Sequence, residues 1–169
     1  MENETQFQDN IPTDHNKMFS GETNEKIADV LNTLIQINND RIEGYGHAAE
    51  ETDESVLKGL FNGMAAKSRM LNSQLADEVQ KYGGQPTEST TSLGKAFRVW
   101  MDFKAALTGK DRKAILVSCE YGEDAAQDAY ADAIKNGSEL PSEIIELITD
   151  QKSQLSDDHN RVKSLRDLE

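Results

Sequence analysis

The chain has 169 residues, and its 31 Asp and Glu against 18 Lys and Arg give a formal net charge of −13. Its length and composition, with 36% hydrophobic and 29% charged residues, fit one globular domain with a short tail. The acidic charge argues against binding to nucleic acid or to an anionic membrane, and the single cysteine excludes an internal disulfide and a zinc site built on several cysteines.

Residues 1–22 have no periodic apolar pattern. They contain five acidic residues and one lysine, and Pro12 interrupts them. We expect this segment to be a polar, flexible tail. Residues 23–169 are expected to form a single four-helix-bundle domain.

Four long stretches have apolar residues at the spacing of an amphipathic helix. In the first of them, Ile27, Leu31 and Leu34 begin an apolar stripe that continues to Tyr45. The same period predicts helices over about 24–51, 54–82, 111–136 and 141–167. No stretch shows the alternation of a β-strand, so the predicted fold class is all-α.

Particular residues mark the ends of these helices. Asp53 is expected to cap the N-terminus of the second helix. Gly83 and Gly84 should end that helix, because glycine tolerates the left-handed conformation at a helix C-terminus. Pro141 suits the first turn of the last helix.

A shorter amphipathic helix is predicted at about 92–107, between the second and third long helices. Its apolar face carries Leu93, Phe97, Trp100 and Leu107. Around it, residues 95–113 contain six basic groups against two acidic ones. We expect the apolar face to close the bundle and the basic face to meet acidic helices. The alternatives are docking on an anionic surface and a symmetric dimer contact.

The lengths of the connections predict the topology. The first and second long helices share a tight turn, as do the third and fourth, so each pair should be antiparallel. The crossover between the second and third is long enough to travel the length of the bundle, so these two helices should be parallel. One such crossover is the ferritin-like arrangement.

Several segments resemble one family of uncharacterised bacterial proteins. They are AAE at 48–50, KYGG at 81–84, WMDFKAALTG at 100–109, KAIL and CEYGEDAA within 113–126, and HNRVKSLRD at 159–167. That family forms ferritin-like four-helix bundles and is catalogued as a domain of unknown function. The resemblance implies a bacterial, cytoplasmic, stress-associated bundle, distantly related to rubrerythrin and ferritin. It supplies no reaction.

A ferritin-like bundle raises the hypothesis of a di-iron or di-manganese carboxylate centre. Such a centre takes a carboxylate from each of two helices and Glu-x-x-His from each of the other two. Here the central stripe positions of the first two helices are Asn38, Ser68 and Leu71, none of which is acidic. Glu43 and His47 lie on the opposite, solvated face of the first helix.

Three weak metal candidates remain, which are Glu123, Asp158 and His159. We favour a structural interpretation, in which Glu123 and His159 border the core and pair with each other or with Arg41 or Arg69. Helix rise brings Glu123 and His159 to similar heights on neighbouring antiparallel helices, so we predict a pair between them. The alternative is one metal ion, Fe or Mn, bound at low affinity.

The third long helix carries a line of small residues, which are Cys119, Gly122, Ala126, Ala129 and Ala133. This line predicts close helix packing, or room for a bulky side chain such as Tyr45 or Tyr82. Space for a cofactor is the alternative. Cys119 is expected to be a small buried side chain, rather than a nucleophile with His159 as its base.

These observations predict a non-enzymatic bundle protein without a cofactor, acting through contacts of its helical surface. The expected partner is a second copy of the chain or another protein. No stretch is long and apolar enough for a membrane span, and the polar N-terminus does not resemble a secretory signal. The expected cytoplasmic location is what the family resemblance implies. The alternative function is that of a divergent Fe- or Mn-dependent redox or metal-binding protein.

Overall fold

A computed structural model describes residues 20–92 and 94–169, and the side chains of 94–97 lie outside that description. The expected polar tail, residues 1–22, therefore falls almost wholly outside the described residues. The same is true of Leu93 and of the Phe97 side chain, two members of the predicted apolar face.

The described residues form five helices and no strands, which confirms the all-α prediction. The helices are α1 (Gly21–Glu51), α2 (Ser55–Lys81), α3 (Gly94–Gly109), α4 (Arg112–Lys135) and α5 (Ser142–Arg166). Each predicted helix is present, and each predicted end lies within three residues of the observed one.

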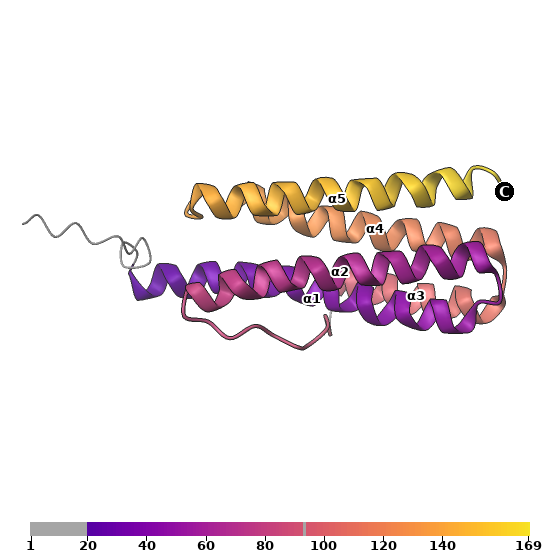
Figure 1. Cartoon of the computed structure of the whole chain (residues 1–169), viewed down its shortest axis with the longest axis horizontal. Coiled ribbons are helices and arrows are strands. Elements are labelled where there is room, and N and C mark those ends of the chain that lie inside the picture. Colours follow the sequence, from indigo (N-terminus) through magenta and orange to yellow (C-terminus); the bar gives the residue numbers. More distant parts are fainter. Residues whose placement is uncertain (1–19, 93) are drawn as a thin grey trace, which may run out of the picture.

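Four long helices lie alongside one another, with α3 in the crossover (Figure 1). α1 and α2 are antiparallel, and so are α4 and α5, because each pair is joined by a short turn. α4 runs in the same direction as α2, since the connection between them returns along the bundle first (Figure 1). The predicted ferritin-like topology is confirmed.

Local sequence explains most of the helix ends. The side chains of Ser20 and Asp111 accept hydrogen bonds from backbone N–H groups in the first turns of α1 and α4. At the end of α2, Gly83 has a φ of 78°, and Gly84 N–H donates to the Val79 carbonyl at 2.9 Å. That bond belongs to a glycine-terminated helix end, as predicted.

The expected cap at Asp53 is wrong. The N-cap of α2 is Glu54, whose side chain makes no capping hydrogen bond. Thr52 stabilises the turn instead, since its hydroxyl oxygen accepts from Glu54 N–H at 3.2 Å. The tight turn therefore places Asp53 one residue too early to cap the helix.

Residues 83–92, which we name the crossover segment, are held along α1 by side-chain amides. Asn32 donates to the Gln85 carbonyl at 3.0 Å and accepts from Thr87 N–H at 2.9 Å. Further along α1, Asn39 donates to the Ser89 carbonyl at 2.8 Å. These bonds satisfy backbone groups that belong to no helix, and they fix the path that leads into α3.

The apolar core has two parts, one in each half of the bundle. One cluster gathers residues of α1, α2, α4 and α5, among them Leu31, Leu75 and Ile148. The other contains α3 and is rich in aromatic rings. In this second cluster, Trp100 and Phe103 pack edge-on against the Tyr45 ring at centroid distances of 5.1 and 5.6 Å. The expectation that α3 closes the bundle is confirmed, although Phe103 is absent from the predicted face.

A glycine of α1 makes the seat for α3. A Cβ atom added at Gly44 would lie 2.3 Å from the Trp100 ring, which is shorter than any real contact. On α4, the same ring lies 3.7 Å from the Cβ position of Gly122, and the Tyr45 hydroxyl lies 3.6 Å from it. The small-residue line of α4 thus makes room for bulky side chains, as predicted for Tyr45.

Candidate functional site

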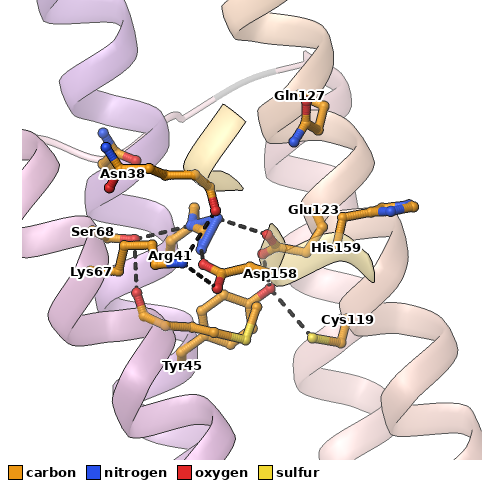
Figure 2. A network of polar contacts seen from close by, with 12 residues as sticks. Asn38, Arg41, Tyr45, Lys67, Ser68, Cys119, Glu123, Gln127, Asp158 and His159 are labelled. Atoms are coloured by element: carbon orange, nitrogen blue, oxygen red, sulfur yellow. Dashed lines mark hydrogen bonds and ion pairs between the residues drawn. The ribbon is translucent and has the colours of Figure 1, made fainter. Parts of the chain in front are cut away.

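A layer of buried polar side chains separates the two apolar clusters. It takes residues from α1, α2, α4 and α5, and Arg41 of α1 lies at its centre (Figure 2). The Arg41 side chain is fully buried, with 0% of its surface exposed. A buried guanidinium is stable only when its charge and its N–H groups are matched, so its partners define the site.

Arg41 joins three helices besides its own. Its Nη1 donates to Glu123 Oε2 at 2.9 Å, and its Nη2 donates to Asp158 Oδ2 at 3.0 Å. Its Nε donates to the Ser68 hydroxyl at 3.0 Å. The guanidinium also lies 5.5 Å from the centroid of the Tyr45 ring. Arg41 therefore ties α1 to α2, α4 and α5 at one height of the bundle.

Both carboxylates of the layer have a second donor. Tyr45 donates its hydroxyl proton to Glu123 Oε1 at 2.5 Å. Lys67 of α2 donates to Asp158 Oδ1 at 2.7 Å. With Arg41 and Lys67 as cations and Glu123 and Asp158 as anions, the network is charge-balanced and each of its four carboxylate oxygens is bonded. We name these four residues, together with Tyr45 and Ser68, the central network.

Burial and ion pairing shift the pKa values of the central network in opposite directions. Burial raises the pKa of Glu123, whereas the Arg41 charge and the Tyr45 hydrogen bond lower it. Burial lowers the pKa of Arg41, but the surrounding acidic groups, Glu123 first and Asp158 among the others, together outweigh burial, so the pKa of Arg41 is raised. Arg41 is therefore permanently charged, and it is the cation on which the buried carboxylates depend.

A second polar chain continues from Asn38 toward α5. Asn38 Nδ2 donates to the Tyr130 hydroxyl at 2.8 Å, and that hydroxyl donates to Gln151 Oε1 at 2.8 Å. Gln151 Nε2 then donates to the Leu71 carbonyl at 3.1 Å. All these side chains are buried. Asn38 is neutral and lies at a position where a two-metal centre would need a carboxylate. Here it takes part in a hydrogen-bond chain between helices.

His159 lies outside the central network. Its Nε2 is 3.0 Å from Asp124 Oδ1 and 3.9 Å from Glu120 Oε1, and its ring is directed away from the Arg41 guanidinium (Figure 2). The predicted pair between Glu123 and His159 is therefore wrong. His159 follows Asp158 by one residue, which turns it about 100° around α5, toward the outer side of α4.

The other site predictions have mixed outcomes. Glu123 and Asp158 do converge, and the pairing of Glu123 with Arg41, the alternative to His159, is correct. Arg69 is exposed and takes no part. Glu43 and His47 are exposed, as predicted, and their ion-pair partners are Lys104 and Glu50.

The basic residues around α3 meet acids on several elements. Lys104 lies 3.5 Å from Glu43 of α1. Arg112 forms ion pairs with Glu54, at 2.9 Å, and with Glu169 at the C-terminus. Two of the six basic groups, Lys104 and Arg112, are thus paired within the bundle, and their partners lie on α1, in the turn before α2 and at the C-terminus rather than on α4 and α5.

Cys119 is buried against the same network. Its thiol donates to the Tyr45 hydroxyl at 3.4 Å. Burial raises the pKa of the thiol well above its ordinary value, and the nearby Glu123 charge adds to the effect. Since a nucleophilic cysteine needs a lowered pKa and access to solvent, Cys119 acts as a small core residue, as expected.

The central network does not fit a two-metal centre. Its carboxylates number two, and a guanidinium nitrogen already lies within 3.0 Å of each. A metal ion between them would meet the Arg41 charge at close range. In residues 20–92 and 94–169, no group of three or more His, Cys, Asp and Glu side chains is arranged to hold a metal ion.

Sequence reasoning missed Lys67 and Tyr45 as members of the site, and it named Arg41 only as an alternative partner of Glu123 and not as the centre of the network. Arg41 lies on the apolar stripe of α1, seven residues after Leu34 and four before Tyr45. That position was the available signal, because a charged residue on a buried stripe needs a buried partner.

Comparison with known proteins identifies a family and a fold. The model of the family described as a domain of unknown function (DUF2383) matches residues 26–136, so the chain belongs to this family. A solved structure described as ferritin-like, diiron-carboxylate proteins from Bacillus anthracis str. Ames is similar, with a TM-score of 0.63 and 19% identity. The similarity covers 89% of this chain and 99% of that one, and it shows a ferritin-like fold. No curated protein matches the chain.

Proposed function

We propose that this chain is a metal-independent ferritin-like bundle that works through contacts of its helical surface and not by catalysis. The observation that supports this proposal is the buried Arg41 guanidinium, which lies 2.9 and 3.0 Å from the two central carboxylates. It provides the positive charge that Glu123 and Asp158 need.

The comparison with a diiron protein sharpens the proposal. In a diiron-carboxylate bundle, metal ions compensate buried carboxylates. Here the compensation comes from Arg41 and Lys67, which are covalently part of the chain. The positions that need further ligands hold Asn38 and Ser68, and both are engaged in hydrogen bonds. The central charges are thus balanced by the chain's own side chains, although Asn38 Oδ1 has no hydrogen-bond partner among the described residues.

Metal analysis tests this proposal directly. The full chain is produced in cells supplied with Fe and Mn, purified without chelator, and examined by elemental analysis and by thermal unfolding with and without EDTA. We expect much less than one metal ion per chain and no change in Tm, because the central network needs no metal. About two Fe or Mn per chain, or a Tm lowered by EDTA, would contradict it.

The alternative is a divergent Fe- or Mn-dependent redox or metal-binding protein. The observation in its favour is the diiron description of the B. anthracis structure, together with two carboxylates at the bundle centre. Oxygen consumption after addition of Fe(II) distinguishes the two functions. Oxidation that exceeds a protein-free control and depends on Glu123 would support the alternative.

The remaining parts of the proposal concern place and partner. We place the protein in the bacterial cytoplasm with a stress-associated role, on the basis of its family resemblance. Its surface contacts are made to a protein, either a second copy of the chain or a different one. Sedimentation velocity separates these two cases. Among the described residues, no helix is long and apolar enough to cross a membrane.

A further inference from the structure

The groove between α1 and α4 is filled by α3 over only one half of the bundle. In the filled half, Trp100 packs against Gly44 of α1 and lies 3.7 Å from the Cβ position of Gly122 on α4. In the other half, a hollow of ≈ 320 Å³ lies between the same two helices. Its lining includes Val30 and Leu34. We name this hollow the open groove.

Helical register places the open groove in line with the surface of α1 and α4 against which α3 packs. Val30 lies fourteen residues before Gly44, close to four turns, so both are on one face of α1. Ala129 lies seven residues after Gly122, close to two turns, so both are on one face of α4. Ala129 is part of the groove lining, and small side chains there leave room for an apolar occupant.

The open groove extends to the turn between α4 and α5. A second hollow of ≈ 320 Å³ adjoins it and shares Val30 and Asn136 in its lining. Ile27 and Leu140 provide its apolar floor. Val30 is only partly covered, so the two hollows form one continuous apolar channel on the surface.

The rim of this channel is acidic. Asp29, Asp132 and Glu139 line it, and the only basic lining residue is Lys26. Lys26 lies 3.4 Å from Glu22 and 3.8 Å from Glu139, so its charge is already compensated. Asp29 and Asp132 are exposed and form no ion pair within the described residues.

We infer that the open groove binds a basic amphipathic helix of a different protein. The inference rests on the proposed function, in which surface contacts carry the activity. α3 is an example of such an occupant within the same groove, since its Trp100 enters the groove and its Lys104 pairs with Glu43 at 3.5 Å. An apolar face meets the channel, and basic side chains meet the acidic rim.

Charge favours a basic helix of a different protein over two other possible occupants of the open groove, a second copy of the chain and residues 1–19. A second copy of the chain would carry a net charge of −13 to an acidic rim. Residues 1–19 of the same chain contain four acidic residues against one lysine, so the rim repels them as well. A basic partner is the occupant that the rim attracts.

Peptide binding tests the inference. The probe is a fluorescent synthetic helix of about 16 residues, the length of α3, with Leu and Ala on one face and Lys on the other. Its control has Glu in place of Lys. Fluorescence anisotropy should show saturable binding of the Lys peptide to the full chain, weakened by salt because the rim contacts are exposed. The Glu peptide should not bind.

Variants then place the binding in the groove. Asp29→Lys with Asp132→Lys should weaken binding about tenfold through the rim charge, and Ala133→Phe should weaken it by filling the channel. Glu146→Lys with Asp150→Lys on α5, which makes the same change of charge away from the groove, should leave binding unchanged. Circular dichroism confirms that each variant is folded, and the charge variants decide the test if Ala133→Phe is not.

Several results would overturn the inference. They are no saturable binding of the Lys peptide, equal binding of both peptides, or equal weakening by the α5 control. A dimer that Ala133→Phe abolishes would make a second copy the occupant, and NOEs from residues 1–19 to Ala129 would make that segment the occupant. A metal-free protein that fails to bind the peptide overturns only this inference, whereas stoichiometric metal overturns the proposed function.

Discussion

Arg41 is the residue on which the central network depends, and its removal leaves two buried carboxylates short of a cation. We predict that Arg41→Met lowers the free energy of unfolding by about 3–5 kcal/mol, the usual cost of breaking a buried ion pair from one side. Urea unfolding measures it. Arg69→Met, on the exposed face of α2, is the matched control and should change stability by less than about 0.5 kcal/mol.

A double substitution separates lost charge from lost packing at the same site. Arg41→Met with Glu123→Met removes the uncompensated carboxylate and leaves Asp158 with Lys67, so most of the lost stability should return. A double variant that is no more stable than Arg41→Met alone would show that Glu123 is not the main partner of Arg41.

Asp158 and His159 are adjacent in sequence, and the structure gives them different environments. Asp158→Asn removes the negative charge that Arg41 and Lys67 share, so we predict a loss of about 3 kcal/mol. His159→Ala removes a pair with the half-exposed Asp124, so we predict a loss of at most about 1 kcal/mol. Urea unfolding of both variants at neutral pH checks the ranking, and equal losses would contradict it.

The candidate site was partly predictable from these residues. Glu123 and Asp158 lie at the borders of apolar stripes, which is why they stood out as candidates. Their partner was not predictable, because the choice between Arg41 and His159 depends on distances between helices. The apolar periodicity of a single helix gives no information about the distances between helices.

At the scale of the element, the contact between α1 and α3 depends on the absence of a side chain at Gly44. A Cβ there would lie 2.3 Å from the Trp100 ring, so Gly44→Ala must displace α3. We predict a loss of about 1–3 kcal/mol, as for other overpacked positions, and a red shift of Trp100 fluorescence as the indole meets water.

Gly46 is the matched control on the same helix. An added Cβ at Gly46 meets nothing within 4 Å, so Gly46→Ala should stabilise the protein by about 0.5–1 kcal/mol through the helix propensity of alanine. A loss of stability in both variants would indicate that the helix backbone, and not Trp100, is sensitive to the change.

The elements themselves were largely predictable, because each long helix has an apolar stripe and glycine or proline near an end. The cap at Asp53 was not, since a turn of three residues leaves the capping position to be decided by local geometry. The path of the crossover segment along α1 was also not predictable from the sequence. It is held by Asn32 and Asn39 through hydrogen bonds to backbone carbonyls, and such bonds follow no hydrophobic period.

For the whole molecule, the order and direction of the helices followed from the lengths of their connections. Two tight turns and one long crossover permit few arrangements of four helices. The fold leaves a buried polar layer midway between two apolar clusters. In that layer and beside it lie several groups that titrate at alkaline pH, and they make the stability of the whole chain depend on pH.

These groups are the Cys119 thiol and the Tyr45 and Tyr130 hydroxyls. Burial raises the pKa of each well above its ordinary value, which is 9.0 for the thiol and 10.0 for the phenols. As pH rises through 9 and 10, the unfolded chain releases these protons and the folded chain keeps them. The unfolded state then binds fewer protons, so the free energy of unfolding falls as pH rises.

We therefore predict that stability is lost progressively above about pH 9, by about 1.4 kcal/mol per pH unit for each group that ionises only in the unfolded chain. Urea unfolding at pH 8, 9.5 and 10.5 measures the fall. Tyr130→Phe removes one of the three groups, so its stability should decline less steeply above pH 10 than that of the unmodified chain. A decline of equal steepness in both proteins would show that the Tyr130 hydroxyl ionises as readily in the folded chain as in the unfolded one, which its burial and the proton that it donates to Gln151 oppose.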